Sequence, residues 1–353
     1  TTRAAIWPGS RPASLAALNS QPVSSVNVSH VTLMPANVTK GQDNVRPFVL
    51  KFTHPNSVTT YSACVIKGIT ITALANDAAP ASALFDGMRI SDGISQFSGP
   101  AIFSASSGAV WLPFGQNLTV TANSYREVTV LADIRADAAS ASFYMSLSKT
   151  TDILAISESS GLAISPAMAL SLTSTASSIQ IPVSYLGVNH VNKMPAYAAK
   201  GQQWVYAEDI VFTHPDPSGR ASVSLRGITL TVEDALGAAM IPSTALAGIT
   251  VLDAANNTVF SSVSMPSSGT QVYLDFGSLL INPSASAVLK VYIRIPASPS
   301  AAAVKLNLNS PSMVNAIDAN SGLALPVQAQ AGDSFAMRSG AVSFVDPASD
   351  VKV

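Results

Sequence analysis

Charge and cysteine are both scarce in this sequence. Only 11% of the 353 residues are charged, the formal net charge is −1, and lysine and arginine form no cluster. Nucleic acids and anionic membranes both need concentrated positive charge, so neither is favoured as a partner. The one cysteine, Cys64, cannot form an internal disulfide and has no Cys or His at metal-ligand spacing. We therefore expect Cys64 to be a small buried hydrophobe.

Catalytic signatures are missing as well. The sequence contains no G-x-S-x-G, H-E-x-x-H, Walker or G-x-G-x-x-G motif, and its densest acidic spot, "VEDA" at 232–235, falls in a predicted turn. The longest uncharged stretch, 159–192, is broken throughout by polar residues, whereas a helical membrane span needs about 20 mainly apolar residues. We predict a protein that is not an enzyme, with no catalytic residues, no cofactor and no membrane span.

An internal repeat is the main feature that the sequence does contain. The stretch "KGQDNVRPFVLKFTHP" at 40–55 returns as "KGQQWVYAEDIVFTHP" at 200–215, and "SGLA" at 160–163 returns at 321–324. Such a repeat predicts two copies of one fold. We assign the domains to 23–176 and 177–333, with an N-terminal extension at 1–22 and a C-terminal tail at 334–353.

The hydrophobic pattern within each copy has a period of two. "GITLTV" and "AVKLNLN" alternate apolar and polar residues, and such runs are separated by clusters of Gly, Pro, Asn, Asp and Ser. This pattern is typical of short, half-buried antiparallel strands. The sequence predicts an all-β protein of two tandem immunoglobulin-like antiparallel β-sandwich domains that arose by internal duplication.

The repeated motifs also carry a resemblance. The "MPA...KGQ" opening, the "FTHP" strand end, the "GITLT" strand with its acidic loop, the "VTVLADI" strand and the "SGLA" close resemble the tandem immunoglobulin-like repeats of prokaryotic secreted or cell-surface structural proteins, of the surface-layer, stalk or filament type. The resemblance covers roughly residues 23–333. It implies a structural or adhesive role without catalysis, and it implies no ligand.

Each copy keeps two histidines. His54 and His214 share strand parity with apolar neighbours and are followed by proline, so we expect them to point inward at a strand end, and His30 and His190 have matching parity. One interpretation is that all four satisfy backbone groups that the strand ladder leaves unpaired. The alternative is a metal site at each pair, although no acidic residue recurs beside either pair.

Two aromatic residues are expected on the outer surface. In "VWLPFG" and "VYLDFG" the apolar residues share one face, which leaves Trp111 and Tyr273 on the other. Each could pack against a loop or the neighbouring domain, contact another protein, or stack on a sugar. The sugar reading would make the chain a carbohydrate-binding adhesion module, the alternative to a structural subunit.

Loops and sequons give weaker indications. "DAANN" at 253–257 and "DANSG" at 318–322 resemble Asx-rich turns, with a structural calcium ion as the alternative. Four N-x-S/T sequons are candidates for glycosylation in an exporting host, at Asn27, Asn37, Asn117 and Asn256. The opening "TTRAAIWPGS" fits a mature form whose leader has been removed. We therefore expect an extracellular or cell-surface location, with glycans as an optional partner.

The terminal segments suggest self-assembly. The tail contains "AVSFV", which has strand-like alternation but no evident partner in its own repeat, and an unpaired strand tends to pair with another chain. The hypothesis is a structural subunit that polymerises with copies of itself, head to tail, into a filament or tube by β-strand addition. The interface candidates are Trp7, Trp111, Tyr273, Phe335, Val342 and Phe344. The competing explanation is that "SGAVSFV" begins a third domain of a longer array.

Overall fold

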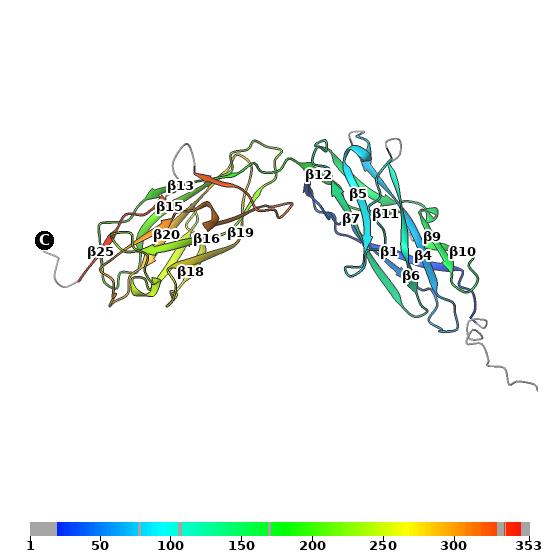
Figure 1. The fold of residues 1–353 in the computed structure, drawn as a ribbon, viewed down its shortest axis with the longest axis horizontal. Coiled ribbons are helices and arrows are strands. Elements are labelled where there is room, and N and C mark those ends of the chain that lie inside the picture. The colour runs from blue at the N-terminus through cyan, green and yellow to red at the C-terminus, as the bar shows by residue number, and fades with distance from the viewer. Residues whose placement is uncertain are drawn as a thin grey trace, which may run out of the picture. The chain divides into compact units, whose positions relative to one another are not determined.

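The fold is all-β, as the sequence predicts. The structure is a computed structural model that describes residues 20–76, 79–104, 108–168, 171–329, 335 and 337–346, in which the only helical elements are short 3-10 turns. Contacts divide the chain into two units, Thr1–Gln180 and Ile181–Val353, and Figure 1 shows the strands of each. The division falls after residue 180 rather than after 176, because Ser177–Gln180 form a strand of the first unit.

Unit 1 consists of two facing sheets joined at one strand. One sheet has the order β1-β3-β7-β5, the other contains β2, β12, β8, β4, β6 and β9, and β10 pairs with β1 of the first and β9 of the second. The strands are β1 (Ser25–Thr32), β2 (Asn37–Thr39), β3 (Phe48–Thr53), β4 (Cys64–Ala75), β5 (Phe85–Ser91), β6 (Ala109–Val120), β7 (Tyr125–Ile134), β8 (Ser142–Leu147), β9 (Ile153–Ser157), β10 (Ala163–Met168), β11 (Leu172–Thr173) and β12 (Ser177–Gln180), with 3-10 turns η2 (Ala81–Ala83) and η3 (Thr150–Asp152).

Unit 2 repeats this plan as two separate sheets. One has the order β18-β17-β20-β15-β13-β23, and the other has the order β14-β25-β21-β16-β19 with β22 and β24 beside it. The strands are β13 (Leu186–Asn192), β14 (Tyr197–Ala199), β15 (Val205–Thr213), β16 (Val223–Glu233), β17 (Gly248–Leu252), β18 (Thr258–Ser262), β19 (Gln271–Ile281), β20 (Ser286–Arg294), β21 (Ala303–Leu308), β22 (Val314–Asp318), β23 (Val327–Ala329), β24 (Met337–Arg338) and β25 (Val342–Val345), with η4 (Pro242–Thr244) and η5 (Pro311–Met313).

The two units match strand for strand, apart from β18. Most pairs are antiparallel, as expected, but each unit also holds two parallel pairs at the same places, β1 with β10 and β2 with β12, and β13 with β23 and β14 with β25. Strand β18 has no counterpart among the described residues of unit 1. The shared pairing supports the internal duplication that the sequence predicts.

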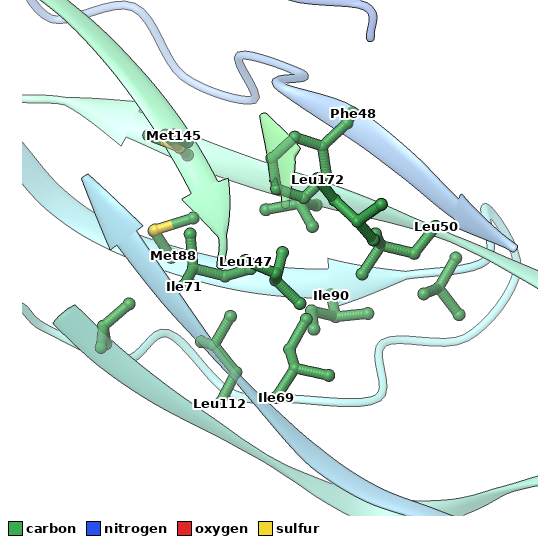
Figure 2. Close-up of a cluster of buried hydrophobic side chains, with 14 of the residues drawn as sticks. Phe48, Leu50, Ile69, Ile71, Met88, Ile90, Leu112, Met145, Leu147 and Leu172 are labelled. Atoms are coloured by element: carbon green, nitrogen blue, oxygen red, sulfur yellow. The ribbon is translucent and has the colours of Figure 1, made fainter. Parts of the chain in front are cut away.

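Alternation of apolar residues builds the core between the sheets. Strand β3 is fully buried at Phe48, Leu50 and Phe52 and half-buried at the residues between them. Figure 2 shows that side chains from β3, β4, β5, β6, β8 and β11 point toward one another in unit 1; those labelled are Phe48, Leu50, Ile69, Ile71, Met88, Ile90, Leu112, Met145, Leu147 and Leu172. A separate cluster of buried residues fills unit 2.

The tail strand is paired within its own unit, so the expectation that "AVSFV" lacks a partner is wrong. Strand β25 runs parallel to β14, with Tyr197 opposite Ser343, and antiparallel to β21, with Val304 opposite Val342. It occupies the place that β12 fills in unit 1, between β2 and β8. Each unit therefore contains its own last strand, and "SGAVSFV" closes the second unit rather than beginning a third.

Candidate functional site: a clasp at the start of each unit

The repeated "FTHP" sequence forms a hydrogen-bonded clasp in each unit. In unit 1, β3 ends at Thr53, and the buried imidazole of His54 donates from Nε2 to the carbonyl of Ser62 at 2.9 Å. The amide of Asn56 donates to Nδ1 of the same ring at 3.1 Å. Nδ1 also lies 3.1 Å from the carbonyl of Asn56. Both ring nitrogens are thus bonded to backbone, and the carbonyl of Ser62 requires a proton on Nε2, so neither nitrogen is a free metal ligand.

The loop at 55–62, which His54 bonds, in turn bonds to the chain at the start of the unit. The amide of Ser62 donates to the carbonyl of Gln21 at 2.8 Å, and the amide of Gln21 donates to the carbonyl of Thr60 at 2.8 Å. His54 therefore stabilises the residue that receives the incoming chain. We call this set of hydrogen bonds the clasp.

Unit 2 repeats the clasp bond for bond. His214, which is fully buried, donates from Nε2 to the carbonyl of Ala221 at 2.8 Å. The amide of Ala221 donates to the carbonyl of Ile181 at 3.0 Å, and the amide of Ile181 donates to the carbonyl of Gly219 at 3.2 Å. The three hydrogen bonds are the same in both units although the residue types around the histidine differ. The repeat therefore preserves the backbone geometry.

Unit 2 adds a carboxylate to its clasp. Asp216 accepts hydrogen bonds from the amide of Ser184 at 2.8 Å and from its hydroxyl at 2.8 Å, and Arg220 lies 4.0 Å away. Burial acts to raise the pKa of Asp216, but the Ser184 hydrogen bonds and the Arg220 charge outweigh it and lower that pKa overall. Arg220 also donates to the carbonyl of Pro182 at 2.8 Å. The clasp and this carboxylate thus hold three residues of the incoming chain, Ile181, Pro182 and Ser184.

The incoming chain has a common pattern, which we call the lead-in segment. It reads "QPVSSVNV" at 21–28 and "IPVSYLGV" at 181–188. The apolar side chains at its third, sixth and eighth positions are buried in both units; these are Val23, Val26 and Val28, and Val183, Leu186 and Val188. The residue before the proline makes the clasp bonds. Sequence comparison of the two copies could have found the proline and serine, but not the bond from the histidine.

The same pattern occurs a third time, directly after the last strand of unit 2. Residues 346–353 read "DPASDVKV", with proline, serine and the three apolar residues at the positions of the lead-in segment. Residues 347–353 lie outside the described part of the chain. In sequence, however, 346–353 follows β25 as 181–188 follows β12.

The other two histidines bond to the backbone on the outer strands. Nε2 of His30 donates to the carbonyl of Thr173 in β11 at 3.1 Å, and Nε2 of His190 donates to the carbonyl of Arg338 in β24 at 3.1 Å. All four histidines therefore satisfy backbone carbonyls, as the first interpretation of the sequence expects. Across the described residues, no group of three or more potential metal-ligating side chains comes together.

Trp111 and Tyr273 lie on the outer surface, each over a glycine of the next strand. They are 42% and 47% exposed. A Cβ atom added to Gly68 would lie 2.4 Å from the Trp111 ring, and one added to Gly227 would lie 2.6 Å from the Tyr273 hydroxyl. Both glycines stand at a bulge in β4 or β16. The aromatic side chains thus cover backbone that a glycine leaves bare, a role in the fold that needs no ligand.

The remaining interface and glycosylation candidates occupy varied places. Trp7 lies outside the described residues. Val342 is fully buried in unit 2, and Phe335 and Phe344 pack against the same core. Asn27, Asn117 and Asn256 are exposed and Asn37 is half-buried. The side-chain oxygens of Asn117 and Asn256 accept hydrogen bonds from Lys67 and Lys290, each at 2.7 Å.

The two acidic loops are Asx turns, and Cys64 is buried. Asp253 accepts from the amide of Asn257 at 2.8 Å, and Asp318 accepts from the amide of Ser321 at 2.9 Å. These oxygens hold the turns themselves. Cys64 is fully buried, and burial raises the pKa of its thiol to about 11. The thiol is therefore protonated and inert, as the sequence predicts.

Unit 2 buries a carboxyl group where unit 1 buries a phenyl ring. Glu208 pairs with Asn192 in the register in which Phe48 pairs with Thr32. Its side chain is fully buried, and neither carboxyl oxygen has a hydrogen-bond partner. Burial, and then the charge of Asp209, raise the pKa of Glu208 to about 8. No strand periodicity could have revealed this, because Glu208 follows a bulge at Tyr206.

Comparisons with known proteins add little. No family model and no curated protein sequence matches the chain. Among solved structures, it is similar to the C-terminal domain of the Streptococcus pyogenes antigen I/II-family protein AspA, with 8% identity, 91% of this chain and 99% of that chain covered, and a TM-score of 0.25. It is also similar to the CFA/I enterotoxigenic E. coli adhesin CfaE, with 9% identity, 93% and 99% covered, and a TM-score of 0.24. Likeness at these TM-scores supports no conclusion about function.

A helix long and apolar enough to cross a membrane is absent from the described residues.

Proposed function

We propose that this chain is a non-enzymatic structural module of an extracellular or cell-surface assembly, in which β-sandwich units follow one another end to end. The observation that supports it is the clasp, which holds the lead-in segment by the same hydrogen bonds in both units. A fold that repeats the hydrogen bonds at the start of each unit can be extended by further units of the same kind. The low charge and the polar, uncharged surface accord with burial of further surface on assembly.

Residues 346–353 are the lead-in segment of the next unit in this proposal. The segment that extends the assembly is therefore 346–353, while 342–345 stays in the sheet of unit 2, where it is already paired. The partner is a unit of the same fold, which belongs either to a longer chain or to a second copy. In the second case the module polymerises head to tail into a filament or tube by strand addition.

The test replaces residues 181–188 of the whole chain with the sequence of 346–353. If the segment is a lead-in, unit 2 folds, and hydrogen exchange at the amide of Ala221 stays as slow as in the unaltered chain, because that amide still bonds to the incoming residue. The matched control is the same replacement with aspartate in place of its two valines. Equal loss of protection in both variants would contradict the proposal.

Electron microscopy then separates the two sources of the partner. Strings of units that disappear when residues 347–353 are deleted would indicate a second copy, since that deletion leaves β25 intact. If the unaltered chain forms only two-lobed particles and unit 2 folds in the variant that carries the sequence of 346–353 at 181–188, residues 346–353 belong to a further unit of a longer chain.

A further inference from the structure

Three aromatic side chains gather on the outer face of unit 2, around the start of β15. Trp204 is 58% exposed and contacts Tyr292 edge to face, with ring centroids 5.7 Å apart. Tyr292 stacks on Tyr206 across the strand pair, with centroids 4.7 Å apart. Paired tyrosines fix the direction of the indole, so Trp204 presents a rigid, exposed ring at small cost in conformational entropy.

Hydrogen-bonding groups flank this cluster. The Tyr206 hydroxyl donates to the carboxylate of Asp209, which also lies 3.8 Å from Nζ of Lys193. Burial, and then this hydrogen bond, raise the pKa of Tyr206, so its proton is retained. Tyr206, Tyr292, Thr250 and Ser261 occupy neighbouring register positions across four strands. The register thus aligns four hydroxyl-bearing side chains, of which Thr250 is buried and bonds to the hydroxyl of Ser261.

Unit 1 provides an internal control for these residues. The register places Leu131 and Arg89 where unit 2 has Tyr292 and Thr250. The Val45–Ala132 bridge matches the Val205–Ile293 pair, which puts Arg46 and Asn44 in the places of Tyr206 and Trp204. There, Arg89 pairs with Asp133 and Asn44 instead. Since the same sandwich forms without the aromatic residues, the fold does not require them. They call for an explanation specific to unit 2.

We propose that Trp204, with Tyr206, Tyr292, Asp209 and Lys193, forms a binding platform for the pyranose ring of a neutral glycan. The apolar C–H face of a pyranose packs on an aromatic ring, and its hydroxyls bond to carboxylate, ammonium and hydroxyl groups at the rim. A protein hot spot also centres on Trp and Tyr within a polar rim. The glycan is favoured here because the Tyr206 hydroxyl, the Asp209 carboxylate and the Lys193 ammonium lie beside the rings, where sugar hydroxyls would bond. Glycan binding goes beyond the structural role and is placed on residues other than Trp111 and Tyr273.

The test measures binding of the whole chain to surfaces that carry cellohexaose, chitohexaose or mannohexaose. We expect the unaltered chain to bind at least one, and Trp204→Ala to lower the affinity roughly tenfold or more. Tyr292→Leu, which installs the residue of unit 1, should act in the same direction. Because Trp204 is largely exposed, thermal unfolding should not change. Trp111→Ala is the matched control and should leave binding unchanged.

Two results would overturn the proposal. One is the absence of binding to all three hexasaccharides by the unaltered chain. The other is binding that Trp204→Ala does not weaken; a loss of self-association in that variant, measured by sedimentation, would identify the cluster as a protein contact instead. The structural proposal is tested apart from this one, because Trp204→Ala does not alter the clasp or residues 346–353.

Discussion

The two units share a skeleton but differ in what they bury and what they display. Both keep the clasp histidine, the aromatic side chain over a strand glycine, and the last strand between the same two neighbours. Only unit 2 buries Glu208 in the core and exposes the Trp204 cluster. Features present twice therefore belong to the repeated unit, and features present once are specific to unit 2.

The largest expected effect comes from Glu208. Its pKa is raised to about 8 in the folded protein, from an ordinary value of 4.5, so the folded state holds the proton more tightly than the unfolded state. The contribution of Glu208 to the free energy of unfolding is therefore greatest below pH 4.5. It falls as the pH rises from 4.5 to about 8 and is constant above that pH. The full loss is about 5 kcal/mol.

Glu208→Gln should abolish this dependence, since the amide cannot ionise. Urea unfolding at pH 5 and pH 9, followed by hydrogen exchange in each unit, measures it. Unit 1, with Phe48 at this place, is the internal control. A pH response of unit 2 that is the same in Glu208→Gln as in the unaltered chain would show that other groups are responsible.

The next largest loss of stability is expected from replacement of the clasp histidines. His54→Ala and His214→Ala each remove a buried ring and leave a backbone carbonyl and an amide without partners, so each should destabilise its own unit by about 3 kcal/mol. Exchange at the amides of Ser62 and Ala221 should accelerate selectively. His30→Ala and His190→Ala, at half-buried positions, should cost about 1 kcal/mol. Equal costs at all four positions would refute a special role for the clasp.

The glycine and aromatic pairs should distinguish the two units by a smaller effect on stability. Gly68→Ala and Gly227→Ala should each cost about 1–3 kcal/mol through close contact. In unit 1, Trp111→Ala should recover part of that loss, because the two nearest atoms belong to the indole, while the carbonyl of Leu112 remains 2.8 Å from the added atom. In unit 2, Tyr273→Ala should recover little, since the carbonyl of Leu274 remains 2.4 Å from the added atom. Thermal unfolding of the single and double variants measures the difference. Equal recovery in both units would contradict this account.

Local periodicity predicted much of the fold, and its failures have physical reasons. Alternation placed Leu50, Phe52 and His54 on the inward face, since burial of one face fixes strand parity. The partners of the last strand were missed, because β25 pairs with β14, far away in sequence, and pairing of that kind leaves no local signal. The Trp204 cluster was missed because its members come from separate strands, and a bulge shifts the parity at Tyr206.

The most direct test of the account asks whether β25 completes the sheet of its own chain. Tyr197 and Ser343 are register partners in β14 and β25, and neighbouring strands are about 5 Å apart, within reach of a disulfide. In the variant with cysteine at both positions, we predict oxidation to a cross-linked monomer on a non-reducing gel, as in the matched variant with cysteine at Asn37 and Ser178. A ladder of disulfide-linked dimers and larger species, formed only by the first variant, would show instead that the strand is donated to another chain.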